Sequence, residues 1–200
     1  MHDHPERPYH HGDLKRVLVE TAQGMLRDAE GWQFTLREVA RRAGVSHAAP
    51  YKHFADKAAL LAELATLGYR QLREELVVAL GPEGKSTRNE ILAVAKAYVS
   101  FGLANPSLYR LMFSSEIDKS RYGDLRDASF ATFEVLLDIL TRGQRAGALK
   151  TASLQGQAAA CWALVHGLTT LELDRQLLPE KVGSKPIDEA LLSLIEGLDA

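Results

Sequence analysis

The sequence predicts an all-α protein in which a small N-terminal domain precedes a larger helical bundle. Apolar residues recur at helical spacing along almost the whole chain, and no run alternates between apolar and polar residues as a half-buried strand would. Capping residues, glycine and proline mark the starts and ends of these helices. We expect residues 1–56 to form the first domain and residues 57–200 the second.

The first two helices are predicted over residues 13–29 and 36–43. The first has a continuous apolar stripe. The second follows Thr35, which with Glu38 has the pattern of a capping box, in which each side chain bonds the other residue's backbone amide. It ends at Gly44, because glycine readily adopts the left-handed conformation of a sharp turn.

A third, short helix is predicted over residues 46–54, with Ser46 as its N-cap. Pro50 then falls at the fourth helical position, where at most the first intrahelical hydrogen bond is lost. Ala40 presents little side chain where the second and third helices must cross. Two short helices joined by a turn at Gly44 make a helix-turn-helix.

Further helices complete the predicted bundle. The longest of them covers residues 56–80 and would extend roughly 36 Å at about 1.5 Å per residue. The others are expected over residues 87–105, a short segment from 106, 124–146, 153–177 and 186–198.

Charge is distributed unevenly along a chain of ordinary globular composition. The 200 residues are 46 % hydrophobic and 25 % charged, with a formal net charge of −2. Residues 35–57 hold five cationic and two acidic side chains, a local charge of +3, so the remaining residues carry −5. This pattern excludes a uniformly basic nucleic-acid coat and favours a confined anion-binding surface.

The single cysteine, Cys161, excludes an intramolecular disulfide and a cysteine-rich metal site. No apolar run reaches the roughly 20 residues that span a bilayer, and the N-terminus has no signal-peptide character, so we expect a cytoplasmic protein without a membrane partner. No motif predicts a metal site or a cofactor. The histidine-rich N-terminus, with Pro5 and Pro8, is expected to be a solvated arm; the alternative is an arm whose Arg7 reaches a minor groove.

The segment that follows the turn has the residues of a DNA-contacting surface. Small side chains such as Ala48 let the backbone approach base edges in a major groove. Tyr51, Lys52 and His53 are placed to bond phosphate oxygens. Lys57 adds a positive charge beside a helix N-terminus, which itself attracts anions.

Residues 35–61 read Thr-Leu-Arg-Glu-Val-Ala-Arg-Arg-Ala-Gly-Val-Ser-His-Ala-Ala-Pro-Tyr-Lys-His-Phe-Ala-Asp-Lys-Ala-Ala-Leu-Leu. This stretch resembles the DNA-binding signature of TetR/AcrR-type transcriptional regulators, and its Tyr-x-His-Phe-x-x-Lys core is highly specific. The match extends over about residues 10 to 62. Tyr9-His10-His11-Gly12-Asp13-Leu14 and Trp162-x-x-x-His166-Gly167 resemble one subgroup of that family, named after its Trp-His-Gly pattern.

The resemblance implies a homodimer with about nine helices per subunit, whose first three helices bind double-stranded DNA. The C-terminal bundle would dimerise and hold a small-molecule effector. The family favours a ligand-responsive repressor that binds a pseudo-palindromic operator and is released by its effector. With the residues argued above, the expected DNA-binding set is Thr35, Arg37, Ser46, His47, Ala48, Tyr51, Lys52, His53 and Lys57. His47 and Ala48 would lie nearest the bases, and Pro50, where many members have an aliphatic residue, leaves the base-reading register open.

Aromatic side chains and methionine on the helices between residues 87 and 177 are candidates for the effector pocket. Together they can surround a flat or apolar ligand, and tyrosine hydroxyls or an imidazole can orient it. Each of them can equally be plain core, and the imidazole can simply bond a backbone carbonyl. The candidates are Tyr98, Phe101, Tyr109, Met112, Phe113, Phe130, Phe133, Trp162 and His166.

The two C-terminal helices are the predicted dimer interface. Gly167 in mid-helix costs about 1 kcal/mol relative to alanine, which is explained if another helix packs closely there. The helices of two subunits would then form a four-helix seam across a two-fold axis. The candidate interface residues are Gly167, Leu168, Leu171, Leu191, Leu192 and Ile195.

The alternative class of function is a helical small-molecule carrier or enzyme with a structural N-terminal domain. The chain has no glycine-rich phosphate loop, no His-Glu-x-x-His motif and no carboxylates paired at a helical spacing. Cys161 lies in an apolar helical stretch, where an inert thiol is expected rather than a nucleophile. The sequence therefore predicts a protein that is not an enzyme.

Overall fold

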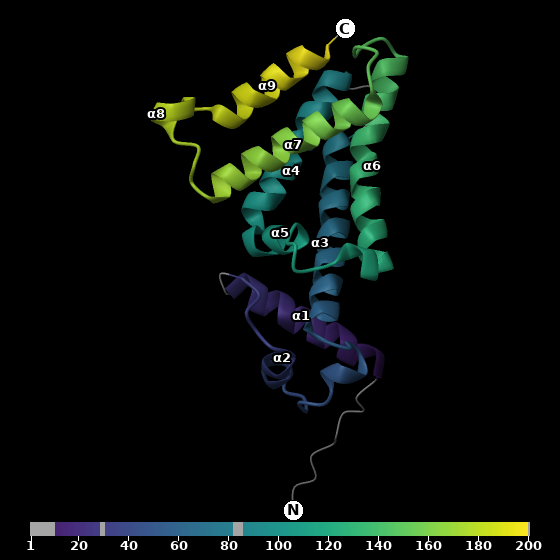
Figure 1. Ribbon diagram of the computed structural model, residues 1–200, viewed down its shortest axis with the longest axis vertical. Coiled ribbons are helices and arrows are strands. Elements are labelled where there is room, and N and C mark those ends of the chain that lie inside the picture. Colours follow the sequence, from purple (N-terminus) through teal and green to yellow (C-terminus); the bar gives the residue numbers. More distant parts are fainter. Residues whose placement is uncertain (1–10, 29–30, 82–85, 200) are drawn as a thin grey trace, which may run out of the picture.

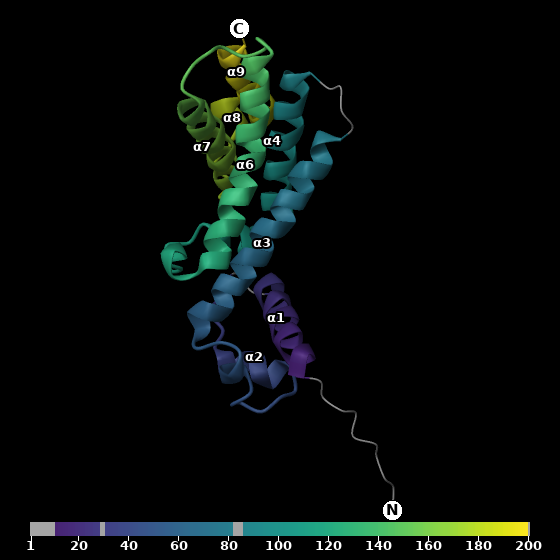
Figure 2. The same ribbon diagram turned by 90° about the vertical axis from the view of Figure 1, so that its right-hand side faces the viewer.

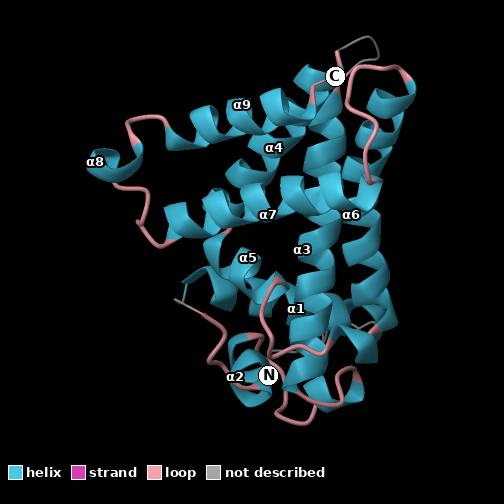
Figure 3. Ribbon diagram, turned by 45° about the horizontal axis from the view of Figure 1, so that its top comes forward, coloured by secondary structure: helices cyan, strands magenta, loops and turns pink. Residues whose placement is uncertain are grey.

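The computed structural model describes residues 11–28, 31–81 and 86–199, and every regular element among these residues is a helix (Figure 3). This confirms the all-α prediction. The α-helices are α1 (His11–Asp28), α2 (Leu36–Arg42), α3 (Lys57–Leu80), α4 (Thr87–Ala104), α5 (Pro106–Met112), α6 (Gly123–Arg145), α7 (Leu154–Leu173), α8 (Pro179–Val182) and α9 (Pro186–Leu198). Two short 3-10 helices are η1 (Pro50–Lys52) and η2 (Lys119–Arg121).

The helix α3 connects the two ends of an elongated molecule (Figures 1 and 2). A small domain of α1, α2 and η1 lies at one end, and α4 to α9 lie with the rest of α3 at the other. α3 has 24 residues, a length of about 36 Å at about 1.5 Å per residue. It packs against α1 in the small domain and against α4, α5 and α6 in the bundle. The buried residues of both ends form one continuous core.

The start of α2 has the predicted capping box. The Thr35 hydroxyl accepts a hydrogen bond from the Glu38 amide at 3.2 Å, and the Glu38 carboxylate accepts one from the Thr35 amide at 2.7 Å. The bond from the Thr35 amide and, after it, one from the Thr35 hydroxyl to the same carboxylate lower the pKa of Glu38. The helix start is therefore fixed by the local sequence, as expected.

The end of α2 is a left-handed glycine turn. Gly44 has a φ of 70°, its amide donates to the Arg41 carbonyl at 3.2 Å, and the Val45 amide donates to the Ala40 carbonyl at 3.0 Å. This pair of bonds is the Schellman motif, whose left-handed position favours glycine because glycine has no Cβ. Ala40 is fully buried, and its small side chain lets the chain return closely over α2.

The prediction of a third helix over residues 46–54 was wrong. The chain forms turns as far as Ala49 and then the single turn η1, with Pro50 at its first position. Ser46 is not a side-chain N-cap, because the N-cap position belongs to Ala49. Pro50 has no amide to donate to the Ser46 carbonyl, which instead accepts a 3-10-type bond from the Ala49 amide at 2.9 Å.

The end of α7 lies earlier than the predicted position. α7 stops at Leu173, four residues before residue 177. Arg175 has a φ of 54°, and the Gln176 amide donates to the Leu171 carbonyl at 2.8 Å. Arg175 thus occupies the left-handed position after the helix, where glycine is usual. The sequence therefore carries no signal for the end of α7.

Close helix contacts inside the bundle depend on glycine at one crossing in particular. A Cβ placed on Gly102 in α4 would lie 2.3 Å from the Thr169 Cγ2 atom in α7 and 3.2 Å from the Tyr109 ring. Thr169 is fully buried, and its hydroxyl donates to the Val165 carbonyl at 2.7 Å. This side chain has little room to move, so α4 and α7 can pack here only because residue 102 is glycine.

By length and hydropathy, no single helix in the described part of the chain would cross a membrane. Only α4 and α5 taken together pass that test, as a pair bent by 109°.

Candidate functional site

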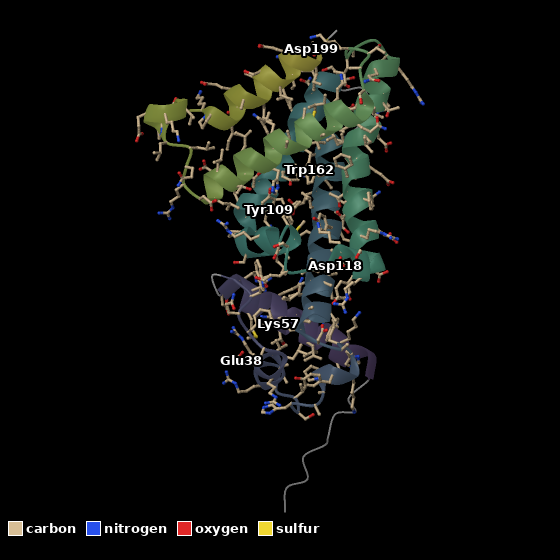
Figure 4. The ribbon with its side chains drawn as sticks, in the orientation of Figure 1. Glu38, Lys57, Tyr109, Asp118, Trp162 and Asp199 are labelled. Carbon is tan, nitrogen blue, oxygen red and sulfur yellow. The ribbon has the colours of Figure 1, made fainter. Side chains whose placement is uncertain are left out.

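The outer end of the small domain exposes the side chains that were predicted to contact DNA (Figure 4, near Glu38). Tyr51 is 52 % exposed, although it is a large aromatic residue. His53 and Lys57 are partly buried. The predicted residues that lie on the surface are Thr35, Arg37, Ser46, His47, Ala48, Tyr51 and Lys52.

Apolar residues between these exposed side chains hold the segment in place. Ala49, Pro50 and Phe54 are buried in the core of the small domain. Lys15 of α1 lies 6.0 Å from the Phe54 ring centroid and bonds the Glu63 carboxylate of α3 at 3.0 Å. The alternation of exposed and buried residues therefore fixes which side chains face outward, although no regular third helix forms.

Two of the predicted phosphate ligands have partners inside the protein. The Thr35 hydroxyl also donates to Glu38 Oε2 at 2.9 Å, so this hydroxyl belongs to the capping box. Lys57 Nζ lies 5.7 Å from the Phe34 ring centroid, a cation–π distance that leaves its ammonium at the rim of the surface. Lys52 and Tyr51 are the better exposed polar groups for a phosphate contact.

At the other end of α3, the bundle contains a partly open cavity of about 580 Å³. Its size lies in the range of sites for drug-sized molecules, about 300–1,000 Å³. Most of its wall is apolar, and it is built by α3, α4, α6, α7 and α9 with the α5–α6 connection (Figure 4, near Trp162). The lining residues are Tyr69, Leu72, Leu76, Ile91, Val94, Ala95, Tyr98, Phe113, Lys119, Ser129, Phe130, Thr132, Phe133, Leu136, Cys161, Trp162, Val165, His166 and Leu194.

The predicted pocket residues divide into two groups. Those that line the cavity are Tyr98, Phe113, Phe130, Phe133, Trp162 and His166. Phe101, Tyr109 and Met112 do not line it and belong to the core, where each is at most 2 % exposed. Met112 packs over Gly68 of α3, and the Tyr109 ring packs beside Gly102 of α4.

Three polar side chains meet at the cavity wall. His166 Nδ1 lies 2.6 Å from Tyr109 Oη and 3.2 Å from Tyr98 Oη, and the two hydroxyls are 3.3 Å apart. Burial raises the pKa of both tyrosines; burial first, then the charge of Lys119, lowers the pKa of His166. At neutral pH this cluster is therefore uncharged, and His166 bonds tyrosines rather than a backbone carbonyl.

Lys119, on η2, brings a positive charge to the same cavity. Its Nζ donates to Tyr69 Oη at 2.6 Å and lies 4.8 Å from the Tyr69 ring centroid and 5.4 Å from that of Phe113. The Tyr69 hydroxyl donates in turn to the Met112 carbonyl at 3.0 Å. Burial lowers the pKa of Lys119 and raises that of Tyr69.

Sequence analysis missed the polar groups Tyr69, Lys119, Ser129 and Thr132 of this wall. Tyr69 stands on the same face of α3 as buried leucines, and a polar aromatic on an apolar stripe was a usable signal. Lys119 lies outside any periodic segment, and no signal marks it. Cys161 lines the cavity, and burial raises the pKa of its thiol to about 11, which keeps it protonated.

The predicted dimer residues on α7 and α9 also divide into two groups. Leu171 and Leu192 are 43 % and 41 % exposed, and no atom of the described residues, apart from the chain neighbours and nearby backbone of its own helix, lies within 4 Å of a Cβ placed on Gly167. The buried members, at most 7 % exposed, are Leu168, Leu191 and Ile195. Within the subunit, α4, α7 and α9 pack on one another and cover these three side chains, which leaves them little surface for a partner.

A direct hydrogen bond joins the two ends of the molecule beside α3. The Trp32 indole, between α1 and α2, donates to Glu116 Oε2 at 2.7 Å. Glu116 lies in the α5–α6 connection, which also supplies Phe113 and Lys119 to the cavity. The same short segment thus contacts the cavity and the small domain. The N-terminal arm with Arg7 lies outside the described residues.

An exposed helix-turn-helix surface and a cavity lined by the helix that begins beside it define a class of protein, the ligand-responsive DNA-binding regulators. The model for the tetracyclin repressor-like C-terminal domain matches residues 91–198, and that for bacterial regulatory proteins of the tetR family matches residues 26–64. The chain belongs to the TetR family, whose members are transcription regulators and not enzymes.

Similar proteins cover most of the chain. A structure of a protein of unknown function from Rhodococcus sp. RHA1 is 35 % identical, with a TM-score of 0.82 over 98 % of this chain and 100 % of that one. A TetR family transcription regulator from Marinobacter aquaeolei VT8 is 17 % identical, with a TM-score of 0.67 over 94 % and 97 % of the two chains. Nucleoid occlusion factor SlmA of Aliivibrio fischeri is 29 % identical over 140 residues, 66 % of this chain and 69 % of that protein.

Proposed function

We propose that this protein is a homodimeric repressor that acts in the cytoplasm, binds a pseudo-palindromic operator and releases it when a small-molecule effector occupies the cavity. One observation carries the proposal: α3 begins with Lys57 at the DNA-contacting surface and lines the cavity further along with Tyr69, Leu72 and Leu76. A ligand against α3 is therefore in contact with the element that carries the small domain.

Operator binding is supported by the exposed segment around η1. In a two-fold dimer, two such segments would enter successive major grooves about 34–36 Å apart. His47 and Ala48, at the tip of the segment, are the proposed base-proximal residues, and Tyr51, Lys52 and His53 the proposed phosphate contacts. Most of the affinity would be electrostatic, and it would fall steeply with salt.

Dimerisation is supported by the exposed faces of α7 and α9. Gly167 has open space within the subunit, so the conformational cost of a mid-helix glycine is explained by a helix of a second subunit. Leu171 and Leu192 are exposed apolar side chains on the same two helices. We place the two-fold seam there, with the buried residues of both helices acting as its support.

Release requires that the effector binds the DNA-free conformation more tightly than the DNA-bound one. Two contacts support transmission from the cavity to the small domain. α3 is one uninterrupted helix of 24 residues, and the Trp32–Glu116 hydrogen bond links the α5–α6 connection to the loop before α2. A shift of α3 or of the α5–α6 connection would change the separation of the DNA-contacting segments of the two subunits.

Assignment to the subgroup with the Trp-His-Gly pattern is part of the proposal. Trp162 and His166 both line the cavity, and Gly167, which is partly buried, has open space where a Cβ would stand. The pattern would then combine a ligand contact and a dimer contact within six residues of one helix.

The test is fluorescence anisotropy with the gene's own upstream region as labelled duplex. We expect a sequence-preferring complex at submicromolar protein, weakened strongly between about 50 and 200 mM salt. A shuffled duplex of the same composition is the control. Equal affinity for both duplexes, or no complex at micromolar protein, would contradict operator binding.

A further inference from the structure

We propose that the effector is an apolar carboxylic acid, bound as a monoanion with its carboxylate on Lys119 and its apolar body against the aromatic wall. This inference rests on the proposed function, because it names the class of ligand for the same cavity. It follows from two features of the described wall residues: one of them is a lysine, and none of them is an aspartate or glutamate.

The cavity wall carries an uncompensated positive charge. Among the described residues that line it, Lys119 is the sole lysine or arginine, and no aspartate or glutamate is present. His166 is neutral, as argued above. No described carboxylate lies within ion-pair distance of Lys119 Nζ. A charge that is partly removed from water without a counter-ion is costly, and an anionic ligand would offset that cost.

The two acidic residues nearest in sequence are committed elsewhere. Asp118 accepts hydrogen bonds from the Ser120 amide at 3.0 Å and the Ser120 hydroxyl at 2.6 Å, and these bonds, the hydroxyl's first, lower its pKa. Glu116 accepts the Trp32 indole. Neither supplies the counter-ion of Lys119. The ammonium is instead held by Tyr69 Oη and two aromatic rings, which fix its position at the wall.

The rest of the wall selects the charge and shape of the ligand. One ammonium balances one negative charge, whereas a phosphate monoester would bring a second charge into a mainly apolar enclosure. Phe113, Phe133 and Trp162 offer aromatic faces to the body of the ligand. The Tyr98–Tyr109–His166 cluster offers neutral hydrogen-bonding groups for a further polar substituent.

The experiment compares matched acid and neutral probes by isothermal titration calorimetry on the full chain. The pairs are octanoate with octanamide and 4-phenylbutanoate with 4-phenylbutanamide, and octyl phosphate tests the dianion. We expect each carboxylate to bind at least about tenfold more tightly than its amide and than octyl phosphate, as a hydrogen bond to a charged group supports.

Two substitutions at the ammonium test its role. Lys119→Met keeps the length of the side chain and should remove the preference for acid over amide, while Lys119→Arg should retain most of it. Lys181→Met makes the same change of charge on α8, outside the cavity wall, and should leave the preference within about twofold of the wild type. Thermal melting of each variant identifies one that fails to fold.

The outcomes separate this inference from the proposed function. Equal binding of acid and amide, binding of no carboxylate at millimolar concentration, tighter binding of octyl phosphate, or a preference that survives Lys119→Met would each overturn the carboxylate assignment. Operator binding is measured in parallel on the wild type without any probe, and its result does not depend on the ligand class. A chain that prefers carboxylates but binds no operator would refute the regulator proposal and leave the ligand class supported.

Discussion

The DNA-contacting surface and the cavity differ in how the chain builds them. The surface comes from one continuous stretch, residues 35–57, in which exposed polar side chains alternate with buried anchors such as Phe54. The cavity takes its lining from residues 69 to 194, on five helices and a connecting segment. A local site is specified by neighbours in sequence, whereas a cavity is specified by how distant helices pack.

This difference implies that the two regions should be separable by mutation. Most side chains of the surface, such as Tyr51 and Lys52, face solvent, so their removal should cost little stability. Side chains of the cavity wall are part of the bundle core, so changes there affect stability as well as binding. The predictions below run from the change with the largest expected effect to the smallest.

The largest effect is expected from Tyr51→Ala, Lys52→Ala and His53→Ala combined. Loss of three proposed phosphate contacts on each subunit should lower operator affinity by about 100-fold or more, and the salt slope should fall by about 1 for each lysine contact removed. Anisotropy titrations at several salt concentrations measure both. Probe binding in the cavity should be unchanged. Intact operator affinity in a folded triple variant would place DNA recognition elsewhere.

Gly167→Leu should weaken the dimer and, through it, operator binding. The subunit itself has space for the new side chain, but a helix packed closely on Gly167 would be pushed away at about 1–3 kcal/mol for the crowded contact. The dimer dissociation constant, measured by sedimentation velocity, should rise about tenfold or more. A matched substitution, Gly24→Leu on α1, should leave the dimer intact. If the Gly167→Leu dimer is as tight as the wild-type dimer, the dimer interface does not include this part of α7.

Two glycine-to-alanine changes should shift stability in opposite directions. Gly102→Ala places a Cβ 2.3 Å from the immobile Thr169 side chain and should cost about 1–3 kcal/mol. Gly24→Ala in α1 meets nothing within 4 Å and should add about 0.5–1 kcal/mol. Chemical denaturation measures both. If Gly102→Ala is neutral, the crossing of α4 and α7 is looser than described.

The fold was largely predictable because its signals are local. Thr35, Glu38 and Gly44 set the ends of α2 by hydrogen bonds to their own neighbours, so the sequence alone identifies them. The failures have equally local causes. Pro50 removes the amide that a helix over 46–54 needs, and Arg175 adopts a left-handed conformation that usually belongs to glycine.

The cavity was predictable only in part, because helical spacing identifies an apolar face but not what it packs against. Phe101 and Phe133 look alike in sequence, yet the first is core and the second lines the cavity. Leu168 and Leu171 are one turn apart on α7, yet only Leu171 is exposed. Such differences depend on which helix lies opposite, and Lys119 reaches the cavity only through the path of the α5–α6 connection.

The smallest and most specific effect is expected where the two regions meet. Trp32→Phe keeps an aromatic ring in the core but removes the hydrogen bond to Glu116, which links the small domain to the segment that carries Lys119. Operator affinity without ligand and carboxylate affinity without DNA should each stay within about twofold, because neither binding surface is altered.

What should change is the coupling, the factor by which a bound carboxylate lowers operator affinity. Coupling energies are typically about 1–3 kcal/mol, and loss of one contributing contact should reduce the factor about two- to fivefold. Glu116→Gln should act in the same direction, and the double variant should add little, since both changes break one contact. Glu20→Gln, which weakens the Arg16–Glu20 pair within α1, is the control. An unchanged coupling factor in Trp32→Phe would leave α3 as the sole proposed route between cavity and operator.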